Sequence, residues 1–176
     1  MKNKNLVWLD LETTGLDLEK DVILEIASIV TDSDLNEMAV GPVVPVYQPD
    51  QVLDDMPDWC LETHGSSSLM EACRTSPYSM REAELKTLEF VSKHVALHTS
   101  PLCGSSVWTD RIYLRRLMPD LEKHFHYRCL DVSSFKEAIS RWRPEITVVK
   151  ERKHRSLDDI RESIAELRLY RERLCI

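Results

Sequence analysis

The sequence predicts an α/β domain with a mixed central sheet, in which an antiparallel meander is followed by parallel strands and helices flank the sheet. Strand patterns come first along the chain, and helical and strand patterns then alternate up to the C-terminus. The length of 176 residues fits one domain, and a hydrophobic fraction of 43% is enough for a sizeable core. We therefore expect residues 1–176 to form a single domain without an internal repeat or a linker.

The first third of the chain is predicted to form the antiparallel meander. Residues 5–12 alternate in polarity, and residues 22–31 are rich in Ile and Val, as is typical of strands. A third strand over residues 38–47 is expected at a sheet edge, because Pro42 and Pro45 lack the backbone N–H that a central strand donates.

Helices and short strands are predicted to alternate in the remainder of the chain. The strands are expected at residues 101–104 and 127–132. The helices are expected after a capping box at residues 79–82 and over residues 110–118, 134–142 and 156–174. The first helix should bury Leu85, Leu88, Val91 and Val95, and the last should bury Ile160, Ile164, Leu167 and Leu174. Residues 145–154 show no clear pattern and are predicted to form a mobile loop.

Composition excludes several classes of protein. A formal net charge of −7 argues against a broad basic face that grips long nucleic acid. The four glycines are too far apart for a glycine-rich phosphate loop, and the five cysteines fit neither a disulfide framework nor a C-x-x-C zinc site. We find no signal peptide and no apolar run of about 18 residues, so no membrane partner is expected. The expected compartment is the cytoplasm, or an organelle if a targeting peptide has been removed.

Three acidic segments are candidate metal ligands. Asp10 and Glu12 are two residues apart on a predicted strand, so both carboxylates project from one face, and such oxygen ligands favour Mg²⁺ or Mn²⁺. Taken alone, this pair is equally consistent with two solvent-exposed acidic residues at the end of a strand. Asp110 has an equally ordinary explanation as a residue at a helix start, and Asp159 has one as the partner of Ser156 in a helix cap.

The order of these residues, with His154 five positions before Asp159, resembles the DEDDh family of 3′-to-5′ exonucleases. Longer stretches narrow the resemblance to the oligoribonuclease family, namely residues 10–17, 81–85, 101–104, 125–128, 130–133 and 157–163. Together they cover nearly the whole chain. The resemblance implies a ribonuclease H-like exonuclease fold and a single exonuclease domain.

The resemblance implies a 3′-to-5′ exoribonuclease that degrades single-stranded RNA of about two to five residues, dinucleotides included, with two divalent ions, Mg²⁺ or Mn²⁺. The products would be nucleoside 5′-monophosphates. In this hypothesis Asp10 bridges both ions, Glu12 and Asp159 complete the first site, and Asp110 supports the second. His154 would remove a proton from the attacking water.

The resemblance also implies residues that bind the bases near the cleaved end. Leu16 would wedge between two bases, and Trp59 would stack on one of them. His64 would contact the substrate close to the scissile bond.

A second set of residues is implied at the other end of the substrate. Ser106, Arg128 and Ser133 would cap the 5′-phosphate and close the site to longer chains. Tyr127 and His126 would reach the site of a partner subunit in a homodimer.

Three residues depart from the usual family pattern, and they leave alternatives open. The family usually has Met where Thr13 stands, Asn where Ser105 stands and a smaller residue where Trp108 stands. The Glu-Thr-Thr-Gly spelling around Thr13 is common among proofreading relatives, so the alternative is a DEDDh exonuclease that acts on longer DNA or RNA. A catalytically silent binding module and a metal-dependent hydrolase of small phosphoesters are two further hypotheses.

Overall fold

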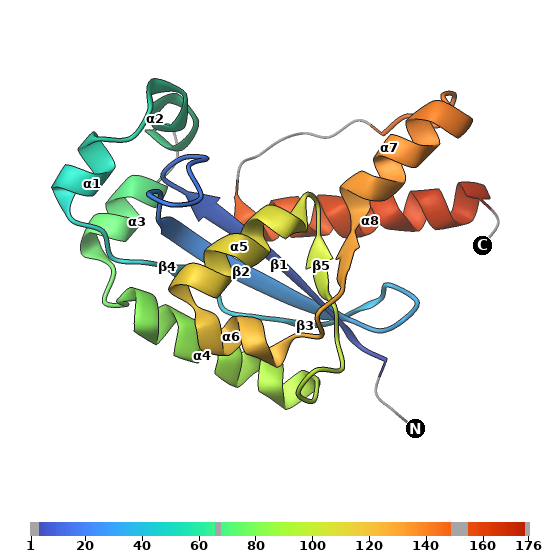
Figure 1. The fold of residues 1–176 in the computed structure, drawn as a ribbon, viewed down its shortest axis with the longest axis horizontal. Coiled ribbons are helices and arrows are strands. Elements are labelled where there is room, and N and C mark those ends of the chain that lie inside the picture. The colour runs from blue at the N-terminus through green and yellow to red at the C-terminus, as the bar shows by residue number, and fades with distance from the viewer. Residues whose placement is uncertain (1–3, 66–67, 149–154, 175–176) are drawn as a thin grey trace.

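A mixed β-sheet organises the chain in a computed structural model that describes residues 4–65, 68–148 and 155–174 (Figure 1). Within these residues the sheet has six strands, ordered β3-β2-β1-β5-β6, with β4 paired to β2. The strands are β1 Leu6–Thr13, β2 Ile23–Thr31, β3 Glu37–Val40, β4 Val44–Pro45, β5 Leu102–Gly104 and β6 Cys129–Asp131. The pairs β1–β2 and β2–β3 are antiparallel, whereas β1–β5 and β5–β6 are parallel, which confirms the predicted meander followed by parallel strands.

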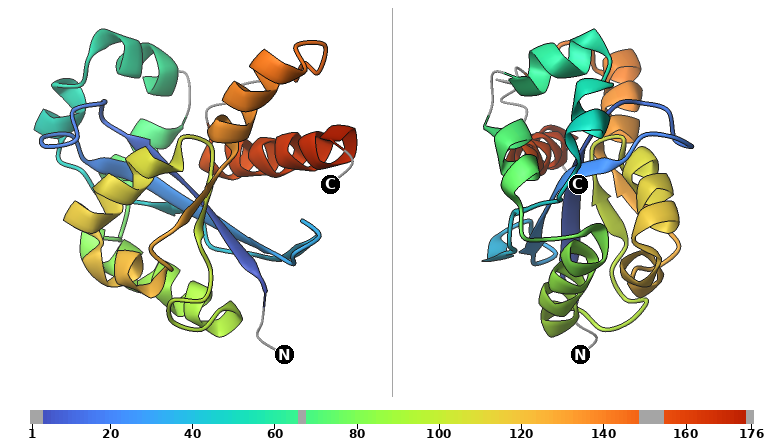
Figure 2. Two further views of the ribbon diagram at one scale, coloured as in Figure 1. Left: turned by 45° about the vertical axis from the view of Figure 1, so that its right-hand side comes forward. Right: turned by 90° about the vertical axis from the view of Figure 1, so that its left-hand side faces the viewer.

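Helices cover both faces of the sheet, as Figure 2 shows for α5 and α8 on opposite sides. The helices of the described residues are α1 Asp50–Asp54, α2 Asp58–Gly65, α3 Leu69–Thr75, α4 Met80–His94, α5 Val107–Leu117, α6 Pro119–His124, α7 Val132–Trp142 and α8 Ser156–Leu174. In these same stretches of the chain, no helix is long and apolar enough to cross a membrane.

The alternation of β1 divides the core between the two faces. Val7 and Leu9 pack on the side of α4, α5 and α6, whereas Trp8 packs with α7 and α8 on the other side. A third apolar cluster joins Leu24 of β2 to α1, α2 and α3. Because side chains on a strand alternate, Asp10 and Glu12 follow Trp8 onto the face that α8 covers.

Several predicted elements differ from the structure in their extent. The strand expected at 127–132 is only Cys129–Asp131, and the helix expected at 134–142 begins at Val132. The expected strand 38–47 is two short strands, β3 and β4, because Pro42 between them has no N–H for a continuous ladder. The helix predicted at 110–118 begins at Val107, so Asp110 lies within its first turn. Its N-terminal flanking residue is Ser106, whose left-handed backbone (φ 53°) turns the chain into the helix.

The buried side of α4 also differs from the prediction. Leu85 is 45% exposed, whereas Glu84 beside it is only 1% exposed. Leu88 is half-buried, and Val91 and Val95 are buried as expected. The reason is that the Glu84 carboxylate accepts hydrogen bonds from the start of α6, which turns this side of α4 inward. The last helix matches the prediction more closely: Ile160, Ile164 and Leu167 are buried, and Leu174 is half-buried.

Candidate active site

Three carboxylates meet where the C-terminal end of β1 faces the start of α8 (Figure 1). Asp10 and Glu12 come from β1 and Asp159 comes from the first turn of α8. Each of them offers an oxygen atom, and these oxygens all lie within 4.8 Å of one another. The structure therefore brings together three of the four predicted metal ligands in one cluster.

The fourth predicted ligand, Asp110, approaches the same strand from α5. Its Oδ1 atom accepts a hydrogen bond from the backbone N–H of Leu11, 3.1 Å away, between the two acids of β1. Burial raises the pKa of Asp110 to about 7. Burial also raises the pKa of Asp10 well above its usual range, and the charges of Asp110 and Glu12 raise it further.

The electrostatics of this cluster favour a bound cation. Burial raises the pKa of Glu12 to about 8, and the nearby charge of Asp159 adds to the shift. Its Oε1 atom is buried without a hydrogen-bond partner among the described residues. Adjacent carboxylates repel one another unless a proton or a cation intervenes, and hard divalent ions take oxygen ligands. The residues present therefore fit the divalent ions that the sequence predicts.

Glu25 is an acidic residue near the site that the sequence analysis missed. It lies opposite Glu12 in the β1–β2 pairing, is buried, and contributes to the raised pKa of Glu12. Its Oε1 atom accepts a hydrogen bond from the Ser156 hydroxyl at 2.8 Å, and Arg155 lies 3.5 Å from Oε2. Glu25 thus ties the start of α8 to β2. The signal for it was a charged residue within an otherwise apolar strand.

Two of the predicted histidines, His64 and His154, have different outcomes. His64 of α2 is buried, with its Nε2 atom 4.0 Å from Glu12 Oε2, so the structure places it beside the carboxylate cluster. His154 lies outside the described residues, two positions before Ser156 in the sequence. Its role as the base stays a prediction.

Leu16 and Trp59, the residues predicted to contact bases, are both exposed. Leu16 lies in the turn after β1, which α5 holds through a 3.0 Å hydrogen bond from the Tyr113 hydroxyl to the Gly15 carbonyl oxygen. Trp59 lies in the first turn of α2, the helix that carries His64. Their exposure leaves both side chains accessible to a ligand.

Two of the residues predicted to cap the 5′-phosphate, Ser106 and Ser133, lie together at the end of β6. The Ser106 N–H donates to Ser133 Oγ and to Asp131 Oδ1, both at 2.9 Å. Arg128 lies on the exposed segment before β6, where its guanidinium lies 5.4 Å from the centre of the Tyr127 ring. On the other side of Tyr127 in the sequence, the centre of the His126 ring lies 4.4 Å from the centre of the Tyr127 ring.

Ser105 and Trp108, the two residues near Asp110 that depart from the usual family pattern, have different surroundings. The Ser105 hydroxyl lies 2.8 Å from that of Ser163, which in turn donates to the carbonyl oxygen of Asp159. Ser105 therefore connects the end of β5 to the helix that carries a carboxylate of the cluster. Trp108 is exposed on the first turn of α5.

Comparisons with known proteins identify the family of the chain. A family model described as exonuclease matches residues 7–167. The oligoribonuclease of Colwellia psychrerythraea is 53% identical over 172 residues, which cover 97% of this chain and 95% of the relative. That of Pseudomonas savastanoi pv. phaseolicola is 54% identical over 173 residues, which cover 98% and 97%. This chain belongs to the oligoribonuclease family.

Membership of the oligoribonuclease family makes the chain a nuclease, and thus a hydrolase. Its fold also occurs in larger exonucleases. A structure of exonuclease I from E. coli in complex with a 5cy-dT13 oligonucleotide superposes with a TM-score of 0.76 at 18% identity, over 98% of this chain and 41% of that one. At this identity the likeness concerns the fold alone. The match to the oligoribonuclease relatives, in contrast, also covers nearly all of those proteins, 95% and 97% of their length.

Proposed function

We propose that this protein is a metal-dependent 3′-to-5′ exoribonuclease specific for very short RNA, dinucleotides included, with nucleoside 5′-monophosphates as products. The observation that carries the proposal is the cluster of Asp10, Glu12 and Asp159, with Asp110 on the adjoining helix, in a chain of the oligoribonuclease family. Residues 1–176 would form one exonuclease domain.

The proposed roles of the acidic residues follow from their chemistry. Asp10, Glu12, Asp110 and Asp159 would hold two divalent ions, Mg²⁺ or Mn²⁺. Such ions, when bound, supply charge stabilisation at the scissile phosphate. His154 takes the proton of the attacking water, a role that suits a side chain titrating near neutrality.

Specificity for short substrates is proposed to come from the two ends of the site. Leu16 separates two bases and Trp59 stacks on one, while His64 meets the substrate near the cleaved bond. Ser106, Arg128 and Ser133 receive the 5′-phosphate and leave no path for further nucleotides. This closed end is consistent with the acidic net charge, because a substrate of a few nucleotides needs no long basic groove.

We also propose a homodimer in the cytoplasm. Support for the dimer comes from Tyr127, which is 73% exposed although it is a proposed substrate contact, as expected of a side chain that serves a neighbouring subunit. Support for the compartment comes from the four described cysteines, all of which are free thiols.

The test compares a 5′-labelled dinucleotide with a long labelled RNA, each with Mn²⁺ and with a chelator. We expect faster metal-dependent cleavage of the dinucleotide to monophosphate. Equal or faster cleavage of the long RNA would instead support an exonuclease for longer strands. Absence of any metal-dependent release would indicate a silent binding module, and hydrolysis of a chromogenic phosphate monoester would indicate a small-phosphoester hydrolase.

A further inference from the structure

Arg111 of α5 holds the backbone of the segment that precedes β6. Its Nη1 atom donates to the carbonyl oxygens of His126 at 2.9 Å and Arg128 at 3.2 Å, and it lies 3.6 Å from the sulfur of Cys129. The chain between these two carbonyls contains Tyr127. One guanidinium therefore fixes both ends of the short turn that presents Tyr127 to solvent.

The other side of the guanidinium is fixed by α6. Arg111 Nε donates to Glu122 Oε1 at 2.9 Å, and the two side chains are only 11% and 12% exposed. Hydrogen bonds of a charged group in such a buried place are stronger and more directional than those at the surface. Arg115 also reaches Glu122, at 3.3 Å, but is 71% exposed. Arg111 is thus the arginine of this pair that is held in place.

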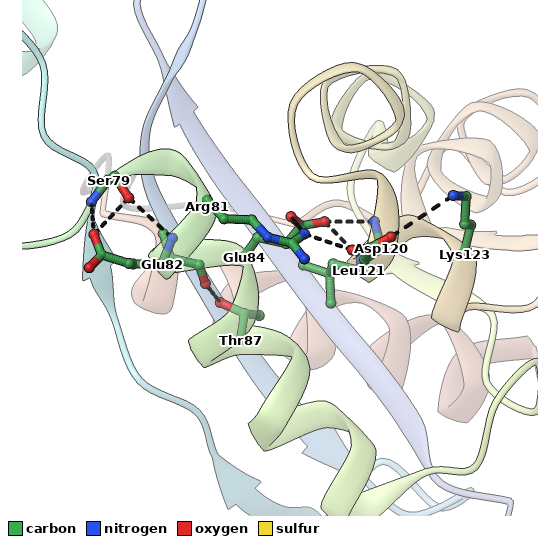
Figure 3. A network of polar contacts seen from close by, with 9 residues as sticks. Ser79, Arg81, Glu82, Glu84, Thr87, Asp120, Leu121 and Lys123 are labelled. Atoms are coloured by element: carbon green, nitrogen blue, oxygen red, sulfur yellow. Dashed lines mark hydrogen bonds and ion pairs between the residues drawn. The ribbon is translucent and has the colours of Figure 1, made fainter.

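The position of Glu122 depends in turn on α4. Figure 3 shows Glu84 of α4 pointing at the start of α6, where its Oε1 atom accepts from the N–H groups of Asp120 and Leu121 at 2.6 and 3.1 Å. Arg81 donates to the other Glu84 oxygen and to Asp120 Oδ2. A chain of hydrogen bonds consequently runs from α4 through α6 to Arg111.

The segment held by Arg111 has an internal arrangement of its own. The Arg128 N–H donates to His126 Nδ1 at 3.2 Å, the His126 ring lies against the Tyr127 ring at a tilt of 32°, and the Arg128 guanidinium lies over the Tyr127 ring. The family resemblance implies a role in substrate binding for all three of these residues. Their side chains are exposed or half-buried, so their orientation depends on how the backbone is held.

We propose that Arg111 is a positioning residue that orients His126, Tyr127 and Arg128 and thereby sets the preference for short RNA with a 5′-phosphate. This inference rests on the proposed function. Arg111 touches none of the clustered carboxylates in the described residues, while Asp110 beside it bonds to β1. Its planar fork contacts two carbonyls and a carboxylate at once, which a lysine ammonium does not reproduce.

The test measures kcat and KM of Arg111→Gln for dinucleotides with and without a 5′-phosphate. The matched control is Arg115→Gln, which removes a guanidinium from the same Glu122 carboxylate but touches neither His126 nor Arg128. We expect the 5′-phosphate preference in kcat/KM to fall about tenfold in Arg111→Gln, chiefly through KM, and to stay within about twofold in Arg115→Gln. A loss of folded protein alone would lower the measured activity on both substrates by the same factor.

Hydrogen–deuterium exchange of the amides at residues 126–129 provides a readout that does not depend on activity. We expect faster exchange in Arg111→Gln, a smaller change in Arg111→Lys and none in Arg115→Gln. Glu122→Gln should follow Arg111→Gln in the same direction, because it weakens the hold on the guanidinium. Should Arg111→Gln match Arg115→Gln in both exchange and substrate preference, the inference is wrong. Absence of a 5′-phosphate preference in the unmodified protein would count against the proposed cap, and exchange would still test the hold on this segment.

Discussion

At the scale of single residues, the site is dominated by acids that are buried next to one another. In water a carboxylate pair of this kind would be ionised at neutral pH, but burial and mutual repulsion raise the pKa values of Asp10 and Glu12. The metal-free protein therefore carries protons where the proposed metal-bound enzyme carries ions. Metal binding and proton release are then linked.

This linkage predicts how the stability of the metal-free protein depends on pH. The pKa of Glu12 rises from 4.5 to about 8 on folding, so the folded chain binds a proton that the unfolded chain releases. The stabilisation is fully present below pH 4.5 and is lost as the pH rises through about 8. Thermal unfolding with a chelator should show the melting temperature falling over this window more steeply than in Glu12→Gln.

Mn²⁺ should reverse this fall in melting temperature. The gain should be largest at high pH, where protons no longer compete for the carboxylates. A metal-free melting temperature that follows the same pH profile in the unmodified protein and in Glu12→Gln would contradict the prediction.

A second prediction concerns the base. His154→Ala should lower kcat on a dinucleotide by about 10²–10⁴-fold, because it removes the group proposed to take the proton of water. Mn²⁺ affinity, measured by calorimetry, should change little. The control is Asp10→Asn, which should lose both activity and metal affinity, since this residue is proposed to bridge two ions. An unchanged kcat in His154→Ala would remove the histidine from the mechanism.

At the scale of elements, the sequence predicted best where one periodicity persists over a long run. The strand β1 and the helix α8 follow from an apolar periodicity, whereas β2, which is buried along its whole length, follows from its richness in Ile and Val. The helices α1 and α3, of five and seven residues, were missed because they are too short for a repeating apolar stripe. They are held by packing around Leu24, a tertiary contact that local pattern does not reveal.

The same distinction applies to the site. Asp10, Glu12 and Asp159 could be predicted because two strand positions and a helix start follow from local spacing and order. Glu25 and Arg111 could not, because each acts on residues that only the fold brings near: Glu25 bonds to Ser156, 131 positions away, and Arg111 bonds to His126, 15 positions away. A charge in an apolar strand, as at Glu25, is the one local sign that such a role leaves.

The helix α4 yields a prediction at this scale. Glu84→Ala should lower the free energy of unfolding by about 2–4 kcal/mol, because it leaves the buried N–H groups at the start of α6 without an acceptor. Urea unfolding measures this loss. The matched control is Glu82→Ala on the same helix, which removes an exposed capping contact to Ser79 and should cost less. Equal losses in the two variants would show that the link from α4 to α6 contributes little.

At the scale of the whole molecule, net charge and substrate size belong together. A net charge of −7 would oppose binding of a long polyanion, yet four of the 30 acidic residues are those proposed to bind metal ions. Contact with phosphate is then local, through ions at one end and Arg128 at the other. In the proposed homodimer, each site is complete only when the second subunit adds its Tyr127 and His126.

The last prediction tests whether Tyr127 acts in the site of its partner. Asp10→Asn and Tyr127→Ala should each be strongly impaired alone. In a mixed dimer, one site combines the intact Asp10 of one chain with the intact Tyr127 of the other. Random reassortment of equal amounts should restore about a quarter of the sites, measured as dinucleotide cleavage after co-refolding.

The matched control mixes Asp10→Asn with His154→Ala, whose defects lie within one chain's own proposed site. No mixed dimer of these two variants contains an intact site, so their mixture should stay inactive. Light scattering of the unmodified protein should give a mass twice that of the single chain, which is 20.5 kDa. A monomer, or a first mixture no more active than the sum of its parts, would place Tyr127 in its own subunit's site and leave the exposed segment around it without a function in trans.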